Sequence, residues 1–169
     1  KAKTMILDLA DMFSYSINVS NSNFNKVIDS VGLVNKYLKI EQTRFGDRLE
    51  YECFIDEEAK SYLVPRFLIQ PLIENAVKHG IDRVKKGKIK LRVTKRKNRL
   101  NISVLDNGPE FPNKLVEGYG SQNIKHKLEL LYKGKYKIQY LNKPEKMVRI
   151  TIINPFIEEP KKFINWIDR

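Results

Sequence analysis

Residues 88–106, KIKLRVTKRKNRLNISVLD, contain the clearest β-hairpin pattern in the chain. In the first half, apolar residues alternate with lysine and arginine, so one face of the strand is apolar. In the second half, an apolar strand over residues 100–106 follows a polar turn at residues 95–98. This stretch therefore predicts two neighbouring antiparallel strands with one buried face.

On both sides of this hairpin, periodicity predicts further helices and strands. Helices are expected at 4–19, 24–43, 65–80 and 121–132, and strands at 48–55, 136–142 and 147–153. Pro71 lies inside the third predicted helix and is expected to bend or interrupt it. Because strands and helices mix without regular βαβ alternation, we expect an α+β fold. The expected architecture is a two-layer α/β sandwich, a mixed and mostly antiparallel sheet with helices on one face, preceded by helical segments.

The composition is that of a globular protein. The chain has 169 residues, 41% hydrophobic and 31% charged, which suits one domain with its own core and excludes a disordered chain. No apolar run approaches the roughly 20 residues of a membrane span. The single cysteine, Cys53, excludes an internal disulfide framework and a cysteine-built zinc site. Because Lys1 is not a natural start, we expect a piece of a longer protein.

The net charge of +12 favours anionic partners such as nucleic acid, a membrane surface or nucleotide phosphates. Ten basic residues and no acidic residue lie in the stretch from Arg83 to Arg99. This run lacks the aromatic side chains on which bases stack, so a solvent-exposed strand face is the favoured interpretation. We therefore expect no nucleic-acid partner.

The segment from Glu74 to Gly80 combines polar groups at helical spacing. Asn75 and His79 lie four residues apart and share a helix face, with Lys78 beside them. An amide oxygen, a cation and an imidazole suit a magnesium–polyphosphate, because Mg²⁺ prefers oxygen ligands and keeps several waters. The alternative is an ordinary helix end, at which Lys and His complement the dipole and Gly80 caps the helix.

Two glycine-containing turns are further candidate binding elements. Asp106, followed by Asn107 and Gly108, ends an apolar strand, where its carboxylate can accept a hydrogen bond from an exocyclic amine such as that of adenine. The alternative is an ordinary Asp-Asn-Gly turn. Residues 118–123 (GYGSQN) open a predicted helix, whose free N–H groups favour an anion. The alternative there is a flexible loop before a helix capped by Ser121.

Three strings in this order carry a resemblance to a known family. They are PRFLIQPLIENAVKHG (65–80), ISVLDNGPEF (102–111) and GYGSQNIKHKLELLY (118–132). They resemble the N box, the first glycine box and the second glycine box of the ATP-binding domain of bacterial sensor histidine kinases. The closest resemblance is to the LytS/YehU type, in the wider family that includes DNA gyrase, a heat-shock chaperone and MutL. The resemblance extends over roughly residues 4–153.

This resemblance implies a role for each matching residue. It implies that Asn75 ligates Mg²⁺, that Asp106 binds the adenine amine, and that Glu74 assists proton transfer or polarises the site as the catalytic residue. The other residues implied to bind the nucleotide are Lys78 and His79 at the phosphates, Gly108 under the base, and Gly118, Gly120 and Ser121 at the lid and the following helix.

The implied function is that of the catalytic, ATP-binding part of a two-component sensor histidine kinase. ATP with Mg²⁺ would supply the γ-phosphoryl group to a histidine on an upstream helix absent from this chain, and a response regulator would receive it next. The resemblance further implies a homodimeric parent in the inner (plasma) membrane and a cytoplasmic location for this part. The implied regions are the end of the dimerisation helices and connector (1–46), the ATP-binding domain (47–155) and a C-terminal tail (156–169).

Three departures from the family pattern keep an alternative open. Glu110 replaces the second glycine of the first glycine box, and Lys146-Met147-Val148 replaces a Gly-Thr whose hydroxyl helps at the adenine. Neither His79 nor His126 lies in a phosphoacceptor string. The alternative is a degenerate nucleotide-binding or non-enzymatic interaction module.

Overall fold

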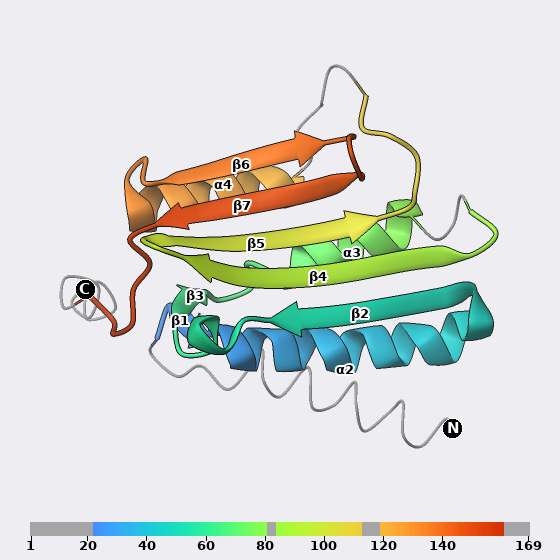
Figure 1. Ribbon diagram of the computed structural model, residues 1–169, viewed down its shortest axis with the longest axis horizontal. Coiled ribbons are helices and arrows are strands. Elements are labelled where there is room, and N and C mark those ends of the chain that lie inside the picture. Colours follow the sequence, from blue (N-terminus) through green and yellow to red (C-terminus); the bar gives the residue numbers. More distant parts are fainter. Residues whose placement is uncertain (1–21, 81–83, 113–118, 161–169) are drawn as a thin grey trace.

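A computed structural model of the chain describes residues 22–80, 84–112 and 119–160, without the side chains of His79, Gly80 and Tyr119 (Figure 1). Its largest element is a five-stranded sheet with the strand order β2-β4-β5-β7-β6. β2 pairs in parallel with β4, and all other neighbours are antiparallel. The strands are β2 (Leu49–Ile55), β4 (Gly87–Arg96), β5 (Arg99–Asp106), β6 (Tyr136–Leu141) and β7 (Met147–Ile153).

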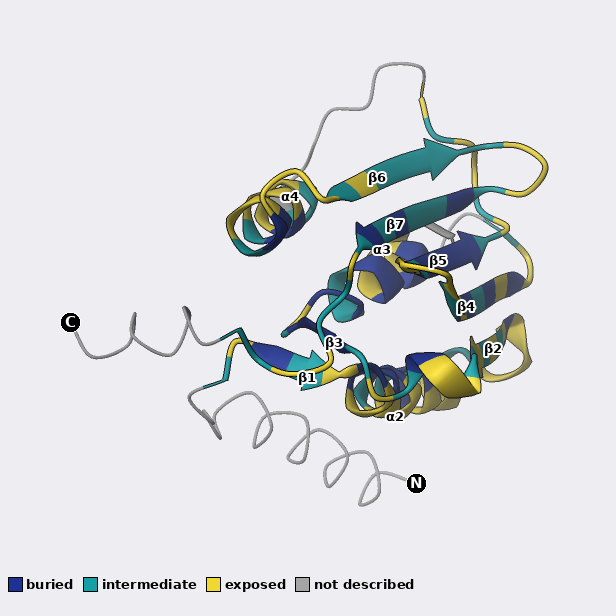
Figure 2. Cartoon of the chain, turned by 60° about the vertical axis from the view of Figure 1, so that its left-hand side comes forward, coloured by how far each residue is buried: buried dark blue, intermediate teal, exposed yellow. Residues whose placement is uncertain are grey.

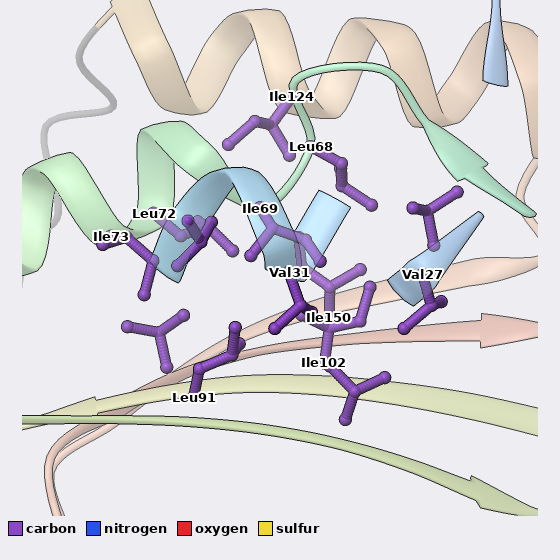
Figure 3. Close-up of a cluster of buried hydrophobic side chains, with 14 of the residues drawn as sticks. Val27, Val31, Leu68, Ile69, Leu72, Ile73, Leu91, Ile102, Ile124 and Ile150 are labelled. Carbon is purple, nitrogen blue, oxygen red and sulfur yellow. The ribbon is translucent and has the colours of Figure 1, made fainter. Parts of the chain in front are cut away.

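Three helices cover one face of this sheet and close the core against it. They are α2 (Val27–Phe45), α3 (Gln70–Gly80) and α4 (Tyr119–Tyr132), and short 3₁₀ turns lie at Gly46–Arg48 and Glu57–Ala59. Figure 3 shows their side chains meeting those of the sheet, and all belong to one buried cluster. In Figure 2 the buried residues accordingly concentrate where helices and strands face each other. None of the described helices is long and apolar enough to cross a membrane.

The opposite face of the sheet carries charged side chains from the basic run. Lys88 Nζ lies 3.5 Å from Glu50 Oε2, and Lys90 Nζ lies 3.6 Å from Glu52 Oε2, across the β2–β4 pair. Lys86 also forms an ion pair with Glu50. Exposed pairs of this kind contribute at most about 1 kcal/mol each to stability, so this part of the basic run is a solvated strand face.

The prediction that a helix begins at Phe24 is wrong. Residues Phe24–Lys26 form a short strand, β1, which pairs with β3 (Leu63–Pro65) in a separate two-stranded sheet. The Phe24 ring packs edge-on against Phe156, with 5.6 Å between ring centroids. Burial of this ring decides the local structure, and the helix begins only at Val27, whose N–H donates to the Tyr62 carbonyl.

The prediction that a helix begins at Pro65 and is bent or interrupted at Pro71 is also wrong. Pro65 ends strand β3, and Phe67 has a positive φ of 57°, which interrupts any helix there. Helix α3 begins at Gln70, so Pro71 lies in its first turn. Because backbone N–H groups in a first turn have no intrahelical acceptor, proline costs nothing at that position and causes no bend.

The chain after β7 returns to the core through Phe156. The Leu63 N–H donates to the Phe156 carbonyl at 2.8 Å, and the Phe156 ring stacks on Tyr132 with centroids 5.0 Å apart. Phe156 thus packs with the sandwich, although the sequence places it at the start of the tail. Helix α2 likewise shares the core, although the sequence assigns it to the 1–46 region. The helix predicted at 4–19 and the residues Phe163 and Trp166 lie outside the described residues.

Candidate functional site

Helix α3 presents a polar face beside the first turn of α4. Its apolar side (Leu72, Ile73, Ala76 and Val77) is buried against the sheet, which leaves Glu74, Asn75 and Lys78 exposed. A Cβ atom added to Gly120 of α4 would lie 3.9 Å from Asn75 Nδ2. The structure therefore brings together the predicted metal ligand Asn75 and the predicted lid residue Gly120.

Glu74 lies on the side of α3 that faces α2. Gln70 Nε2 donates a hydrogen bond of 2.8 Å to Glu74 Oε1. Burial, followed by the charges of Glu41 and Glu74, raises the pKa of the Tyr37 hydroxyl well above its ordinary value. Tyr37 therefore stays protonated as a neighbour of Glu74. The sequence analysis missed Tyr37, because a tyrosine in an amphipathic helix carries no signal that distinguishes it from other core residues.

Asp106 is the last residue of β5, and its carboxylate already forms a hydrogen bond and an ion pair. Its Oδ1 accepts a hydrogen bond of 2.9 Å from the Gly108 N–H and lies 2.7 Å from Lys146 Nζ. Both side chains of this ion pair are buried, with 6% of Asp106 and 9% of Lys146 exposed. The first contact is the turn that the sequence left open as an alternative. The second contact brings in Lys146, which the sequence analysis noted only as a departure from the family pattern.

Asn107 holds the strand end in place. Its Oδ1 accepts from the Lys88 N–H at 2.7 Å, and its Nδ2 donates to the Lys86 carbonyl at 2.9 Å. These bonds tie the end of β5 to the start of β4, so Asn107 positions Asp106 by fixing its backbone. The Asp-Asn-Gly motif alone does not reveal this role of Asn107, because it depends on the pairing of β4 with β5.

The described part of the loop after β5 is attached to the β6–β7 turn, which lies at the same end of the sheet as Asp106. Phe111 donates its N–H to Asn142 Oδ1 at 2.8 Å, and Asn142 Nδ2 returns a hydrogen bond of 3.0 Å to the Phe111 carbonyl. The Phe111 ring lies edge-on to Tyr140, with centroids 5.4 Å apart. Glu110, beside it, is exposed. Residues 113–118, including Gly118, lie outside the described residues.

Helix α4 begins two residues before its predicted start. Ser121 is therefore inside the first turn, and is not the N-cap. It lines a cavity of about 450 Å³ together with Lys125, Glu129 and Tyr140, between α4 and β6. Neither Asn75 nor Asp106 lines this cavity, so the cavity is separate from the place that Asn75 and Gly120 share, although Ser121 directly follows Gly120 in the first turn of α4.

The donors of this region suit a metal that is carried by a polyphosphate. Among the described residues, no group of three or more His, Cys, Asp or Glu could hold a metal ion. An exposed amide at Asn75 offers one oxygen, and Mg²⁺ that is bound to phosphates needs only one or two protein ligands. Lys78 follows on the same exposed side, and His79 belongs to the same helix.

Two family profiles match the chain. Residues 63–157 match the histidine kinase-, DNA gyrase B- and HSP90-like ATPase family, and residues 1–49 match a histidine kinase family. The first match extends from the start of β3 to Ile157 and includes every predicted site residue.

Curated relatives and solved structures agree with these matches. The sensor histidine kinase YpdA of Escherichia coli is 34% identical over 142 residues, which are 78% of this chain and 25% of YpdA. The sensor protein LytS of Staphylococcus epidermidis is 31% identical over 125 residues, which are 73% of this chain and 21% of LytS. The chain thus spans about a quarter of the length of these relatives.

A solved structure is similar in fold. The histidine kinase domain of the blue-light activated kinase from Erythrobacter litoralis superposes with a TM-score of 0.60 at 16% identity. The match covers 90% of this chain and 74% of that domain. Because the sequence identity is low, this similarity supports the fold alone. The predicted α+β sandwich of the histidine-kinase type is thereby confirmed.

Proposed function

The chain belongs to the histidine kinase-, DNA gyrase B- and HSP90-like ATPase family, and on this premise we propose that it is the ATP-binding part of a sensor histidine kinase in two-component signalling. YpdA is named as a sensor histidine kinase and LytS as a sensor protein, and the matched residues are only 25% of YpdA and 21% of LytS. The complete activity therefore belongs to a longer parent protein. Because this is an ATPase family, we take ATP to be the bound nucleotide.

The proximity of Asn75 to Gly120 carries this proposal. It joins the exposed amide of α3 to the N-terminal turn of a 14-residue helix, α4. The free N–H groups and the dipole of such a turn favour phosphate, while the amide oxygen suits Mg²⁺. Two elements distant in sequence thus offer complementary groups for one metal–polyphosphate.

We assign the remaining roles around this pair of residues. Asp106 holds the adenine amine, with Gly108 beside the base. Asn75 is the ligand for Mg²⁺, and the phosphates are bound by Lys78 and His79 on α3 and by Gly118, Gly120 and Ser121 at the lid. Helix α3 packs on β4 and β5, so Asn75 lies on the helix-covered side of the sheet. Asp106 is the last residue of β5, one of the two strands that α3 contacts.

The chemistry of the proposed site is positioning and charge neutralisation. ATP supplies the γ-phosphoryl group, and Mg²⁺ neutralises the polyphosphate charge when both are bound. We assign to Glu74, which is exposed on α3, the role of receiving or holding the proton of an attacking histidine supplied by the parent's upstream helix. The next acceptor is a response regulator, and the parent is a membrane-bound homodimer.

Thermal unfolding with and without Mg-ATP tests nucleotide binding. At about 100 times the dissociation constant, the ligand should add roughly 2.7 kcal/mol to the free energy of unfolding. Mg²⁺ alone and ATP with a chelator are the controls and should add much less. An equal stability in all four solutions would contradict the proposal.

The catalytic role needs the parent protein. In the parent, Glu74→Gln should lower the rate of histidine phosphorylation and leave ATP affinity unchanged, because Glu74 has no role in binding. A loss of affinity without a loss of rate at saturating ATP would contradict the role of Glu74. The alternative of a non-enzymatic module is not favoured by the relatives.

A further inference from the structure

Asp106, the last residue of β5, lies opposite Lys146, the residue just before β7. The register pairs Leu105 with Met147, and one position further the Asp106 N–H donates to the Lys146 carbonyl at 3.2 Å. From these opposed positions the two side chains meet, with 2.7 Å between Lys146 Nζ and Asp106 Oδ1. The contact is therefore built into the strand register.

The pair lies on the face of the sheet that the helices cover. Side chains alternate along a strand, so Asp106 shares its face with Val104, and Lys146 shares its face with Val148. Val104 is buried in the core, and Val148 packs against it. Lys146 therefore points to the same side as the carboxylate to which we assign the base.

The ammonium group of Lys146 is also held in place by the aromatic ring of Phe111. Its Nζ lies 4.7 Å from the centroid of the Phe111 ring, a cation–π contact. Phe111 is fixed in turn by its two hydrogen bonds to Asn142 and by its contact with Tyr140. The lysine is thus a buried, positioned group rather than a mobile surface side chain.

We propose that Lys146 is a specificity-determining residue of the base site, and that it relaxes the choice between 6-amino and 6-oxo purines. This inference rests on the proposed function, since it takes Asp106 as the group that receives the base. Lys146 contributes a hydrogen-bond donor and a positive charge next to the carboxylate acceptor.

The reason lies in what each arrangement can pair with. A carboxylate alone only accepts hydrogen bonds, so it binds the amine of adenine and repels the carbonyl oxygen of a 6-oxo purine. A carboxylate beside an ammonium group offers both kinds of partner. The carboxylate of Asp106 can accept from the N1–H of hypoxanthine, while the ammonium group of Lys146 donates to O6. With adenine, the same pair accepts from the amine and donates to N1.

Calorimetric titration with Mg-ATP and Mg-ITP tests this proposal. In the unsubstituted protein, ITP should bind within about fivefold of ATP. In Lys146→Met, the ratio of the ITP to the ATP dissociation constant should rise at least about tenfold, the size of discrimination by a good pair of base contacts. Lys143→Met is the control, because it removes one positive charge from an exposed position in the same turn and should leave the ratio unchanged.

Lys146→Met leaves the buried carboxylate of Asp106 without its partner, and this protein could fail to fold. A second variant keeps the proposal testable in that case. Lys146→Gln keeps a neutral hydrogen-bond donor beside the carboxylate and should give an intermediate ratio. An unchanged ratio in either folded variant overturns the proposal, as does an ITP affinity in the unsubstituted protein more than about a hundredfold below that of ATP. If the unsubstituted protein binds neither nucleotide, the proposed function itself fails.

Discussion

Gly120 in the first turn of α4 lies beside Asn75 of α3, at a distance that leaves room for one methyl group. A Cβ atom added to Gly120 would be 3.9 Å from Asn75 Nδ2, an ordinary van der Waals contact. Its φ lies outside the left-handed region. Neither backbone conformation nor packing therefore requires glycine here, and we attribute the residue to the space that a nucleotide needs.

Gly120→Ala should separate stability from binding. Alanine replaces glycine in a helix, so the free energy of unfolding should rise by up to about 1 kcal/mol. The same methyl group projects toward Asn75, so the affinity for Mg-ATP should fall. Denaturant unfolding and calorimetry on one sample measure both. An affinity equal to that of the unsubstituted protein would contradict our explanation of Gly120.

Glu110 belongs to the first glycine box, which the family resemblance puts near the triphosphate, and its side chain is exposed. Glu110→Gly should tighten ATP binding by about 1 kcal/mol at low salt, the scale of an exposed charge effect. The gain should shrink as salt is added, because salt screens exposed charges. Titrations at two salt concentrations measure this. A gain that does not depend on salt would mean that backbone freedom, and not charge, is responsible.

Cys53 should be an unreactive thiol in the folded protein. Burial raises its pKa to about 11 from an ordinary value of 9.0. At pH 9, its alkylation by iodoacetamide should be roughly fiftyfold slower than in denaturant, because far less thiolate is present. Since the folded state holds the proton more tightly, this group favours folding below pH 9, and the contribution is lost as the pH rises toward 11. Equal rates in both states would contradict this prediction.

Phe156 should be part of the folding unit. Its ring contacts Tyr132 and Phe24, so Phe156→Ala should lower the free energy of unfolding by about 2 kcal/mol, less than for a fully buried phenylalanine. Ile157→Ala is the matched control, because Ile157 is 59% exposed and its loss should change stability by less than about 0.5 kcal/mol. Equal effects of the two substitutions would place Phe156 outside the core.

The sequence alone predicts secondary structure and exposure correctly where apolar residues recur at one regular spacing. The alternation from Lys88 to Asp106 predicts the central hairpin, and the structure has it as β4 and β5. The spacing in α3 likewise predicts that Asn75 is exposed while its apolar neighbours are buried. In both cases the side chains that decide the structure are near neighbours in the sequence.

Contacts between distant segments were not predictable in this way. Phe24 is in a strand because Pro65 pairs with it and Phe156 packs on its ring. The pairing of Lys146 with Asp106 depends on the register of β5 and β7, which a single sequence does not reveal. The sequence marks Lys146 as unusual for the family, but only the register gives it a partner.

The central claim is that Asn75 binds the metal of Mg-ATP, and calorimetric titration of Asn75→Ala tests it most directly. The ligand is Mg²⁺ with a non-hydrolysable ATP analogue, and the control is Asn35→Ala, an exposed asparagine on α2. We predict that the heat of binding disappears in Asn75→Ala and persists in Asn35→Ala, with unfolding temperatures that match that of the unsubstituted protein. An unchanged affinity of a folded Asn75→Ala protein would contradict the assignment of this site.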